Sequence, residues 1–229
     1  MDPLAGTPWS TPGTVSGFAT SPPNSTLMAY ADAIQRATPS PRAVDIGCGA
    51  GRNAVPLARA GWTVVGTDLS WPMLAAAAAR RHGEAPGSRL QLALGGMERL
   101  PLADRSVDLV IAHGIWNLAS STTLFRQAVA DAARVARPGA ALFVFTFSRH
   151  TLSDAARPVP GEAFVFTEFS GQPQCFLTED ELRAELGRAG FDADPAVPLR
   201  ELNRPAAGSL LSRSGPVIYE AAFRRRVTA

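Results

Sequence analysis

The 229-residue chain contains no lysine, and it has only two cysteines and three histidines. Cys48 lies in a glycine-rich turn, which argues against a structural disulfide with Cys175 and suits a reducing cytoplasm. The histidines, at positions 82, 113 and 150, lack the spacing of metal ligands, so we expect no bound metal. All 22 basic residues are arginine, and together with the abundant alanine this indicates a GC-rich bacterial genome.

The chain also lacks a large excess of positive or negative charge, and it lacks long apolar segments. The net charge of +2 is too small to indicate a nucleic-acid partner, and the one dense basic segment, 224–226, resembles a solvated strand end. No apolar segment reaches the length of a membrane span. The N-terminus has no basic stretch followed by an apolar one, so we expect no signal peptide. The sequence therefore predicts a cytoplasmic protein that contacts neither membranes nor nucleic acids.

Apolar strand patterns and helical patterns alternate along the chain, which predicts an α/β fold with a parallel sheet covered by helices on both faces. The length fits one such domain with additions. Strands are expected at 42–47, 63–67, 89–94, 108–112 and 141–147, with a weak strand at 192–200 and a last strand at 217–223. Helices are expected at 27–37, 51–60, 71–82, 121–137 and from 178 to near 190.

Residues 1–25 are rich in proline, glycine, serine and threonine, a composition typical of a disordered arm. The arm nevertheless carries Trp9 and Phe18, which a solvated tail would not favour. Two interpretations stay open, a flexible tail or a lid that folds over the active site. Residues 148–177 are irregular as well, apart from a short apolar stretch at 163–166.

The segment Val44–Asn53 indicates a binding site for a nucleotide-like ligand. It ends a buried strand and turns through Gly47, Gly49 and Gly51, where no side chain blocks a ligand. A helix that follows such a turn directs its N-terminal amides at whatever the turn holds. Asp68 ends the next strand, and its carboxylate can accept hydrogen bonds from both hydroxyls of a ribose. Together these residues predict a cofactor that contains a nucleoside.

The spacing of the glycines separates two classes of cofactor. Dinucleotide folds use G-x-G-x-x-G, but here Arg52 occupies the third glycine position and the pattern is G-x-G-x-G, preceded by Asp45. This departure argues against an NAD(P)-dependent oxidoreductase. A glycine turn that binds nothing remains the simplest alternative.

Four stretches within residues 41–147 share a pattern with one known family, namely Gly47–Asn53, Gly61–Ser70, Leu100–Leu102 followed by Ser106–Val110, and Arg134–Gly139; beyond that range, Phe176–Leu182 and Gly190–Phe191 do so as well. Through them, residues 41–147 resemble the core of class I S-adenosylmethionine (SAM)-dependent methyltransferases of the bacterial small-molecule branch. The resemblance implies a single domain over 1–229 with a Rossmann-like three-layer αβα sandwich. Its seven-stranded, mostly parallel sheet would have the order 3-2-1-4-5-7-6. Residues 1–25 would form the arm, 41–147 the SAM-binding core, and 148–229 a substrate-side insert, a helix and the last strands.

The resemblance also implies SAM as cofactor, with S-adenosylhomocysteine as the product. Asp68 would bind the ribose hydroxyls and Leu69 would pack on the adenine. The implied cofactor-binding residues are Asp45, Gly47, Cys48, Gly49, Gly51, Asn53, Asp68, Leu69, Met97, Glu98 and His113. The family often has an aspartate at the position of Gly96, so here we expect a main-chain contact or Glu98 itself to reach the adenine edge.

Catalytic and substrate-binding residues are expected beyond the carboxyl ends of the strands, where open α/β sheets bind ligands. His113 and His150 follow two strands and are candidate catalytic bases, with a structural or lining role as the alternative. Candidate substrate-binding residues are Trp9, Phe18, Arg52, Trp116, Asn117 and Arg149. Trp116 could instead belong to the core, and Arg52 could hold the SAM carboxylate or lie on the surface.

The resulting prediction is an enzyme that transfers a methyl group in line from SAM to a small-molecule acceptor. The acceptor atom, O, N, C or a chalcogen, stays open, as do the acceptor itself and the oligomeric state. A SAM-binding sensor or scaffold without methyl transfer is the main alternative, and an NAD(P)-dependent oxidoreductase is a weaker one.

Overall fold

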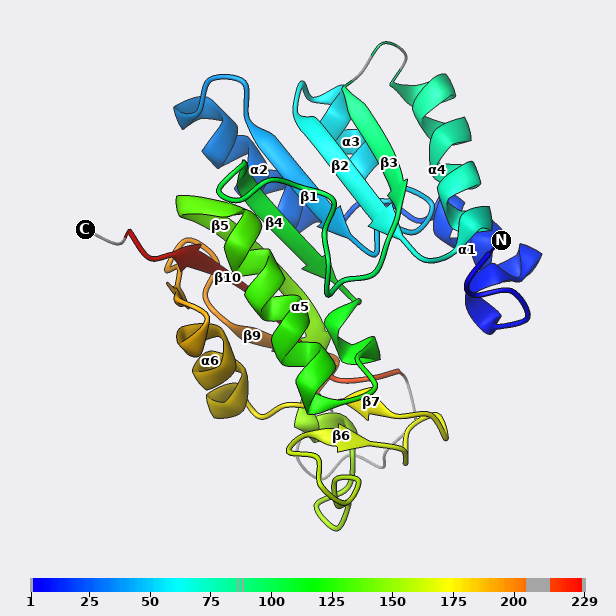
Figure 1. The fold of residues 1–229 in the computed structure, drawn as a ribbon, viewed down its shortest axis with the longest axis vertical. Coiled ribbons are helices and arrows are strands. Elements are labelled where there is room, and N and C mark those ends of the chain that lie inside the picture. The colour runs from blue at the N-terminus through cyan, green and yellow to red at the C-terminus, as the bar shows by residue number, and fades with distance from the viewer. Residues whose placement is uncertain (1, 86, 88, 205–214, 228–229) are drawn as a thin grey trace.

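The computed structural model describes residues 2–85, 87, 89–204 and 215–227. These residues form a central sheet of eight strands in the order β3-β2-β1-β4-β5-β10-β8, with β9 also paired to β10 (Figure 1). The first five strands are parallel, and β10 runs antiparallel to β5. Their bounds are β1 Arg42–Ile46, β2 Thr63–Asp68, β3 Leu90–Leu94, β4 Val107–His113, β5 Ala136–Phe147, β8 Phe191–Ala193, β9 Arg200–Leu202 and β10 Ile218–Arg225. The α/β class and the order 3-2-1-4-5-7-6 are confirmed, with β10 as the seventh strand and β8 as the sixth.

Helices cover both faces of this sheet (Figure 1). One face is covered by α2 (Ser25–Ala37), α3 (Ala54–Arg59) and α4 (Trp71–Glu84), and the other by α5 (Thr122–Val135) and α6 (Glu179–Arg188). Side chains at the positions just before four of these helices accept hydrogen bonds from first-turn amides, and these are Asn24, Ser70, Ser121 and Thr178. Helix α6 begins with a capping box, in which the side chains of Thr178 and Glu181 each accept a hydrogen bond from the other residue's backbone amide.

Several element boundaries differ from the sequence-based expectation. Helix α3 begins at Ala54 rather than 51, because Gly51 has φ +77° and so cannot be helical. Helix α5 ends at Val135, and β5 already begins at Ala136 and runs through Pro138–Gly139 as an irregular stretch beside Val107. The weak strand at 192–200 is instead β8 and β9, since Pro195 and Pro198 lie between them and lack the N–H that a strand ladder requires.

The N-terminal arm contains two short helices, η1 (Pro8–Ser10) and α1 (Pro12–Thr20), where irregular structure was expected. Asp2 accepts a hydrogen bond from the Trp71 amide at 3.1 Å, and the hydroxyls of Ser10 and Ser70 lie 3.0 Å apart. These contacts place the arm over the beginning of α4, next to the turn after β1.

The chain between β5 and α6 contains a 3-10 helix, η3 (Arg149–Thr151), and a separate two-stranded sheet of β6 (Val165–Phe166) and β7 (Gln174–Cys175). Among the described residues, no helix combines the length and apolarity needed to cross a bilayer.

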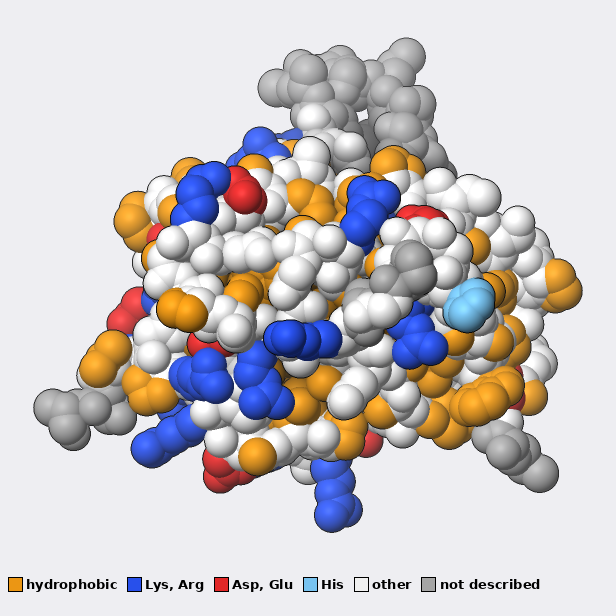
Figure 2. Space-filling model, turned by 90° about the horizontal axis from the view of Figure 1, so that it is seen from above, with side chains coloured by type: hydrophobic (Ala, Val, Ile, Leu, Met, Phe, Trp, Pro, Cys, Tyr) orange, Lys and Arg blue, Asp and Glu red, His pale blue; other side chains and the backbone are white. Residues whose placement is uncertain are grey.

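Arginines are spread over the surface rather than gathered into one patch on the face seen in Figure 2, where apolar and uncharged side chains separate them. Two arginines of the basic segment at the end of β10 have acidic partners. Arg224 donates to Asp194 at 2.6 Å and Arg226 to Asp192 at 2.7 Å. These charges are therefore largely neutralised locally.

Candidate functional site

A cavity of about 440 Å³ lies beyond the carboxyl ends of β1, β2 and β4, at the edge where the sequence predicts a ligand. The turns after β1, β2 and β3, the segment after β4 and the N-terminal arm enclose it. It is lined by Leu4, Trp9, Phe18, Gly47, Gly49, Arg52, Asp68, Leu69, Met73, Gly95, Gly96, Met97, Glu98, His113, Gly114, Ile115, Leu118, Leu124 and Phe145.

The turn after β1 depends on its glycines. Gly47 has φ +65°, and a Cβ atom there would lie 2.6 Å from Cδ1 of Ile115. Gly49 has φ +52°, and its amide donates to Oδ2 of Asp68 at 2.8 Å. Any larger side chain would be strained at both positions, and at Gly47 it would also collide with the wall opposite. The turn thus leaves bare backbone facing the cavity.

Asp68 is fixed by main-chain donors at the end of β2. Oδ1 accepts the Ser70 amide and Oδ2 accepts the Gly49 amide, each at 2.8 Å. Burial raises the pKa of this carboxyl, although the amides of Ser70, Gly49 and Leu69 oppose the rise. Each oxygen keeps a lone pair, so the carboxylate can still accept hydrogen bonds from two neighbouring hydroxyls.

Asp45 lies beneath the glycine turn and is 1% exposed. Burial and the nearby Asp68 raise its pKa to about 7, while the Ala54 amide and Arg52 lower it. Its Oδ2 has no hydrogen-bond partner among the described residues. A buried carboxyl oxygen without a partner is costly, and a cationic group reaching it would relieve that cost.

Glu98 lies over Gly96 in the turn after β3. A Cβ atom at Gly96 would lie 2.6 Å from Oε1 of Glu98. The Glu98 carboxylate therefore occupies the space that an aspartate at position 96 would need. Glu98, two residues after Gly96, thus supplies an acidic group at this wall of the cavity.

His113 ends β4, and its ring stacks on Phe145 of β5 with centroids 4.2 Å apart and planes 8° from parallel. Burial and the charge of Arg52 lower its pKa to about 4, against opposing effects of its own backbone carbonyl and Glu220. The imidazole is therefore neutral at physiological pH, and a group this weakly basic is a poor general base.

Ten of the residues expected from the sequence to form the site line this cavity, namely Trp9, Phe18, Gly47, Gly49, Arg52, Asp68, Leu69, Met97, Glu98 and His113. Four others lie behind the glycine turn. Asp45, Cys48 and Asn53 are buried there, and Gly51 packs against Val55 and Ala77.

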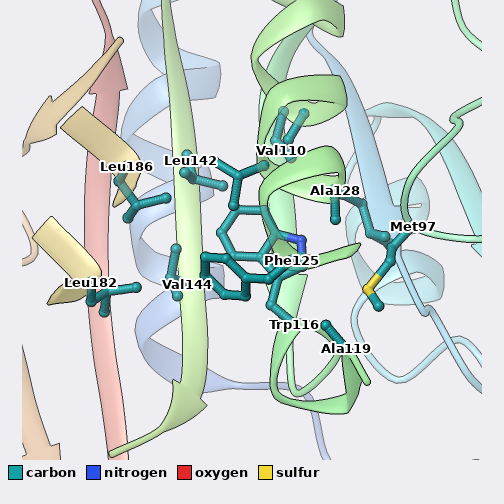
Figure 3. Close-up of a cluster of buried hydrophobic side chains, with 14 of the residues drawn as sticks. Met97, Val110, Trp116, Ala119, Phe125, Ala128, Leu142, Val144, Leu182 and Leu186 are labelled. Atoms are coloured by element: carbon teal, nitrogen blue, oxygen red, sulfur yellow. The ribbon is translucent and has the colours of Figure 1, made fainter. Parts of the chain in front are cut away.

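Trp116 and Asn117 do not reach the cavity, contrary to the sequence-based expectation. Trp116 is fully buried and packs edge-on against Phe125 beneath α5, with its ring among the sheet residues drawn in Figure 3. Asn117 is 3% exposed. The 3-10 helix after β4 turns both side chains into the core and leaves Ile115 and Leu118 at the cavity.

His150 and Arg149 also lie outside the cavity. His150 faces a separate groove, where its Nδ1 is 2.6 Å from Oε1 of Glu201. Arg149 donates to the carbonyls of Ser153 and Ala156 and sits over the ring of Phe166. Ser148 is still extended, and its amide donates to the Val217 carbonyl at 2.9 Å. The chain then turns in η3, which carries Arg149 and His150 to places outside the cavity.

Nine lining residues were not named individually as site residues from the sequence, although Gly96, Gly114 and Ile115 lie in segments expected at the site, and these nine are Leu4, Met73, Gly95, Gly96, Gly114, Ile115, Leu118, Leu124 and Phe145. The sequence could have indicated Phe145, since it lies near the carboxyl end of the predicted strand 141–147. The lid interpretation of residues 1–25 already covered the arm that carries Leu4. Nothing in the sequence indicated Leu124, because only the tertiary arrangement brings the start of α5 to this edge. Among the described residues, no group of three or more His, Cys, Asp or Glu could hold a metal ion.

Residues 44–144 match a family model described as a methyltransferase domain. A ubiquinone biosynthesis O-methyltransferase of Azorhizobium caulinodans is 30% identical over 154 residues, which cover 66% of this chain and 58% of that protein. A probable S-adenosylmethionine-dependent methyltransferase of Mycolicibacterium smegmatis is 29% identical over 188 residues, covering 80% of this chain and 64% of that protein. The chain thus spans less than two thirds of the length of these relatives.

Solved structures share the fold. The 1,6-didemethyltoxoflavin-N1-methyltransferase of Burkholderia thailandensis superposes with a TM-score of 0.64 at 19% identity, over 89% of this chain and 79% of that one. A SAM-dependent methyltransferase structure of Methanosarcina mazei superposes with a TM-score of 0.63 at 19% identity, over 86% of this chain and 98% of that one. The sequence matches, the strand order and the glycine turn agree: residues 44–144 are similar to methyltransferase domains, and the chain has the fold of SAM-dependent methyltransferases.

Proposed function

We propose that this protein transfers a methyl group from SAM to a small-molecule acceptor in the cavity at the carboxyl edge of the sheet. The observation that carries the proposal is the convergence of a bare glycine turn with two carboxylates, Asp68 and Glu98, on one cavity. The match of residues 44–144 to a methyltransferase domain supports the same activity. The cytoplasmic location expected from the sequence stays a prediction.

The residues present fit SAM on structural grounds. Asp68 offers two oxygens to the ribose hydroxyls, and Glu98 offers an acceptor to the adenine amino group. The unpartnered oxygen of Asp45 suits the ammonium of the methionine part. Arg52, at the same turn, suits the carboxylate of the methionine part or an anionic acceptor.

The chain's own contribution to methyl transfer is positioning and exclusion of water. When bound, SAM supplies an electrophilic methyl group on a sulfonium. Ile115, Leu118 and Leu124 give the cavity apolar walls, which shield a reacting pair from solvent. The rings of Phe18 and Phe145 can present electron-rich faces, which attract a cation.

The arm is proposed to act as a lid over the bound cofactor. Phe18 approaches the glycine turn, since a Cβ atom at Gly49 would lie 3.5 Å from Cδ1 of its ring. Trp9 packs edge-on against Phe18 with centroids 6.2 Å apart. Arg52 fastens the end of the arm by donating to the Pro22 carbonyl at 2.6 Å. An acceptor would then enter only when the arm moves.

For the acceptor, the names of relatives suggest where a screen should begin. They include a ubiquinone biosynthesis O-methyltransferase and a demethylmenaquinone methyltransferase. We therefore propose hydroxylated aromatic and quinone-related compounds as the first acceptors to be tested with labelled SAM.

The cofactor proposal is tested by calorimetry with SAM, S-adenosylhomocysteine and NAD on the wild type and on Asp68→Ala. We expect both adenosyl ligands to bind and NAD not to bind. The substitution should weaken binding by about 100-fold or more, because hydrogen bonds to a charged acceptor contribute about 1.5–3 kcal/mol each. Asp32→Ala, which removes an exposed carboxylate on α2, is the matched control and should bind like the wild type. Failure of the wild type to bind SAM would overturn the proposal.

A further inference from the structure

Four side chains form a row across four neighbouring strands beside the cavity. The strand register places His113 of β4 next to Phe145 of β5, Phe145 next to Glu220 of β10, and Glu220 next to Arg200 of β9. Residues directly opposite each other in a sheet project from the same face, so these four side chains share the face that α2 covers. The row connects the cavity wall to the outer edge of the sheet.

Asn24 bridges this row from the helix layer. Its amide nitrogen donates to Oε2 of Glu220 at 2.8 Å and lies 3.4 Å from Nε2 of His113. Its Oδ1 accepts the Leu27 amide at 2.8 Å as the N-cap of α2, and its own backbone amide donates to Asn53 at 3.1 Å. Because the oxygen is committed to the helix, the nitrogen must face Glu220 and His113. The orientation of the amide is thus determined by the fold.

The same bonds determine which atom of His113 carries a proton. An amide nitrogen is only a donor, so the Nε2 that it faces must be the unprotonated acceptor, and the ring hydrogen is on Nδ1. A proton added at Nε2 would point at the Asn24 hydrogens. Glu220 is 1% exposed and is held by Arg200, whose Nε donates to Oε1 at 2.9 Å. The charged groups that face His113 are therefore Arg52 from the glycine turn and Glu220, which is already paired.

We propose that Asn24, supported by Glu220 and Arg200, is a positioning residue that holds His113 as a neutral wall of the cavity, so that the enzyme accepts only methyl acceptors that are already nucleophilic without a base from the protein. This inference rests on the proposed methyl transfer. It names a substrate class, namely compounds with a hydroxyl or thiol acidic enough to ionise near neutral pH. Among the described residues that line the cavity, Arg52 carries the only fixed positive charge, which would attract such an anion.

The first test needs neither cofactor nor acceptor. Imidazole ¹⁵N NMR of the full chain distinguishes the two tautomers, and substitution of each of the three histidines in turn by glutamine assigns the signals. The wild type should show His113 in the Nδ1–H form with no titration between about pH 6 and 8. Asn24→Ser, which keeps an N-cap oxygen but removes the amide hydrogens, should shift His113 toward the Nε2–H form. Arg36→Ala, at the exposed end of the same helix, should leave the signal unchanged.

A second variant at the same position, which should make His113 easier to protonate, strengthens this test. Asn24→Asp also keeps the N-cap but places a carboxylate against Nε2, so His113 should bind a proton within the measured pH range. A wild-type His113 in the Nε2–H form, or one that titrates between about pH 6 and 8, would overturn the proposal. So would an Asn24→Ser protein with an unchanged tautomer.

The second test measures the substrate class. With two acceptors of different acidity from the screen, the inflection in the pH profile of kcat/KM should move with the pKa of the acceptor. An inflection at the same pH for both would indicate a protein base and refute the substrate class. His113→Phe, which keeps an aromatic ring beside Phe145, and His113→Gln should lower kcat by less than about 10-fold. Loss of a true general base costs about 100-fold or more. Failure of SAM to bind would refute the proposed function while leaving the NMR result in force.

Discussion

Replacing Asp45 with asparagine should remove a large pH dependence from the stability of the protein without cofactor. Burial and Asp68 raise the pKa of Asp45 to about 7 in the folded protein, against an ordinary value of 3.8. The folded state thus keeps a proton that the unfolded chain releases. The stabilisation from Asp45 is fully present below about pH 4 and is lost progressively as the pH rises to about 7.

The pKa difference of roughly three units corresponds to about 4 kcal/mol over that whole range, because each unit is worth about 1.4 kcal/mol. Between about pH 5 and pH 8, where reversible urea unfolding is practical, the ionisation of Asp45 should lower the free energy of unfolding by about 3 kcal/mol. Asparagine keeps the shape of the side chain and an oxygen for the Ala54 amide, but it cannot ionise. The free energy of unfolding of Asp45→Asn relative to the wild type should therefore rise by about 3 kcal/mol from pH 5 to pH 8.

The comparison is made as a difference between proteins, so that the other titrating groups cancel. Asp192→Asn, which removes an exposed carboxylate paired with Arg226, serves as the control and should show no such rise. An Asp45→Asn difference that is equal at both pH values, or that falls as the pH rises, would refute the assignment of a protonated, buried Asp45.

Three further perturbations test the walls of the cavity. Gly47→Ala should destabilise the protein by about 1–3 kcal/mol in urea unfolding, because φ is +65° and the new Cβ would collide with Ile115, whereas Gly17→Ala, in open space on α1, should not destabilise it. Phe18→Ala should weaken S-adenosylhomocysteine binding by about 10-fold if the arm is a lid, and calorimetry that gives wild-type affinity would contradict the lid. Glu98→Gln should reduce the preference for adenine over hypoxanthine in matched homocysteine nucleosides, and an unchanged preference would assign the adenine contact to the main chain.

Local sequence determined the parts of this protein that depend on local physics. Glycines at 47, 49 and 51 indicate a turn with positive φ because other residues are strained there, and all three have it. Apolar strands alternating with capped helices predict a parallel sheet. Asp68 was predicted to contact a ligand because it ends a strand, and the structure places it in the lining of the cavity. The strand order came from family resemblance rather than from these patterns.

Only the tertiary structure decided which distant segments meet. The register of β4, β5, β10 and β9 aligns His113, Phe145, Glu220 and Arg200, and one N-cap asparagine from another layer spans that row. The two candidate bases looked alike in sequence, since each lies at the end of a strand, yet the 3-10 helix η3 after β5 places His150 in a different groove. Such outcomes depend on hydrogen bonds between residues far apart in the chain, and no local pattern of residues encodes them.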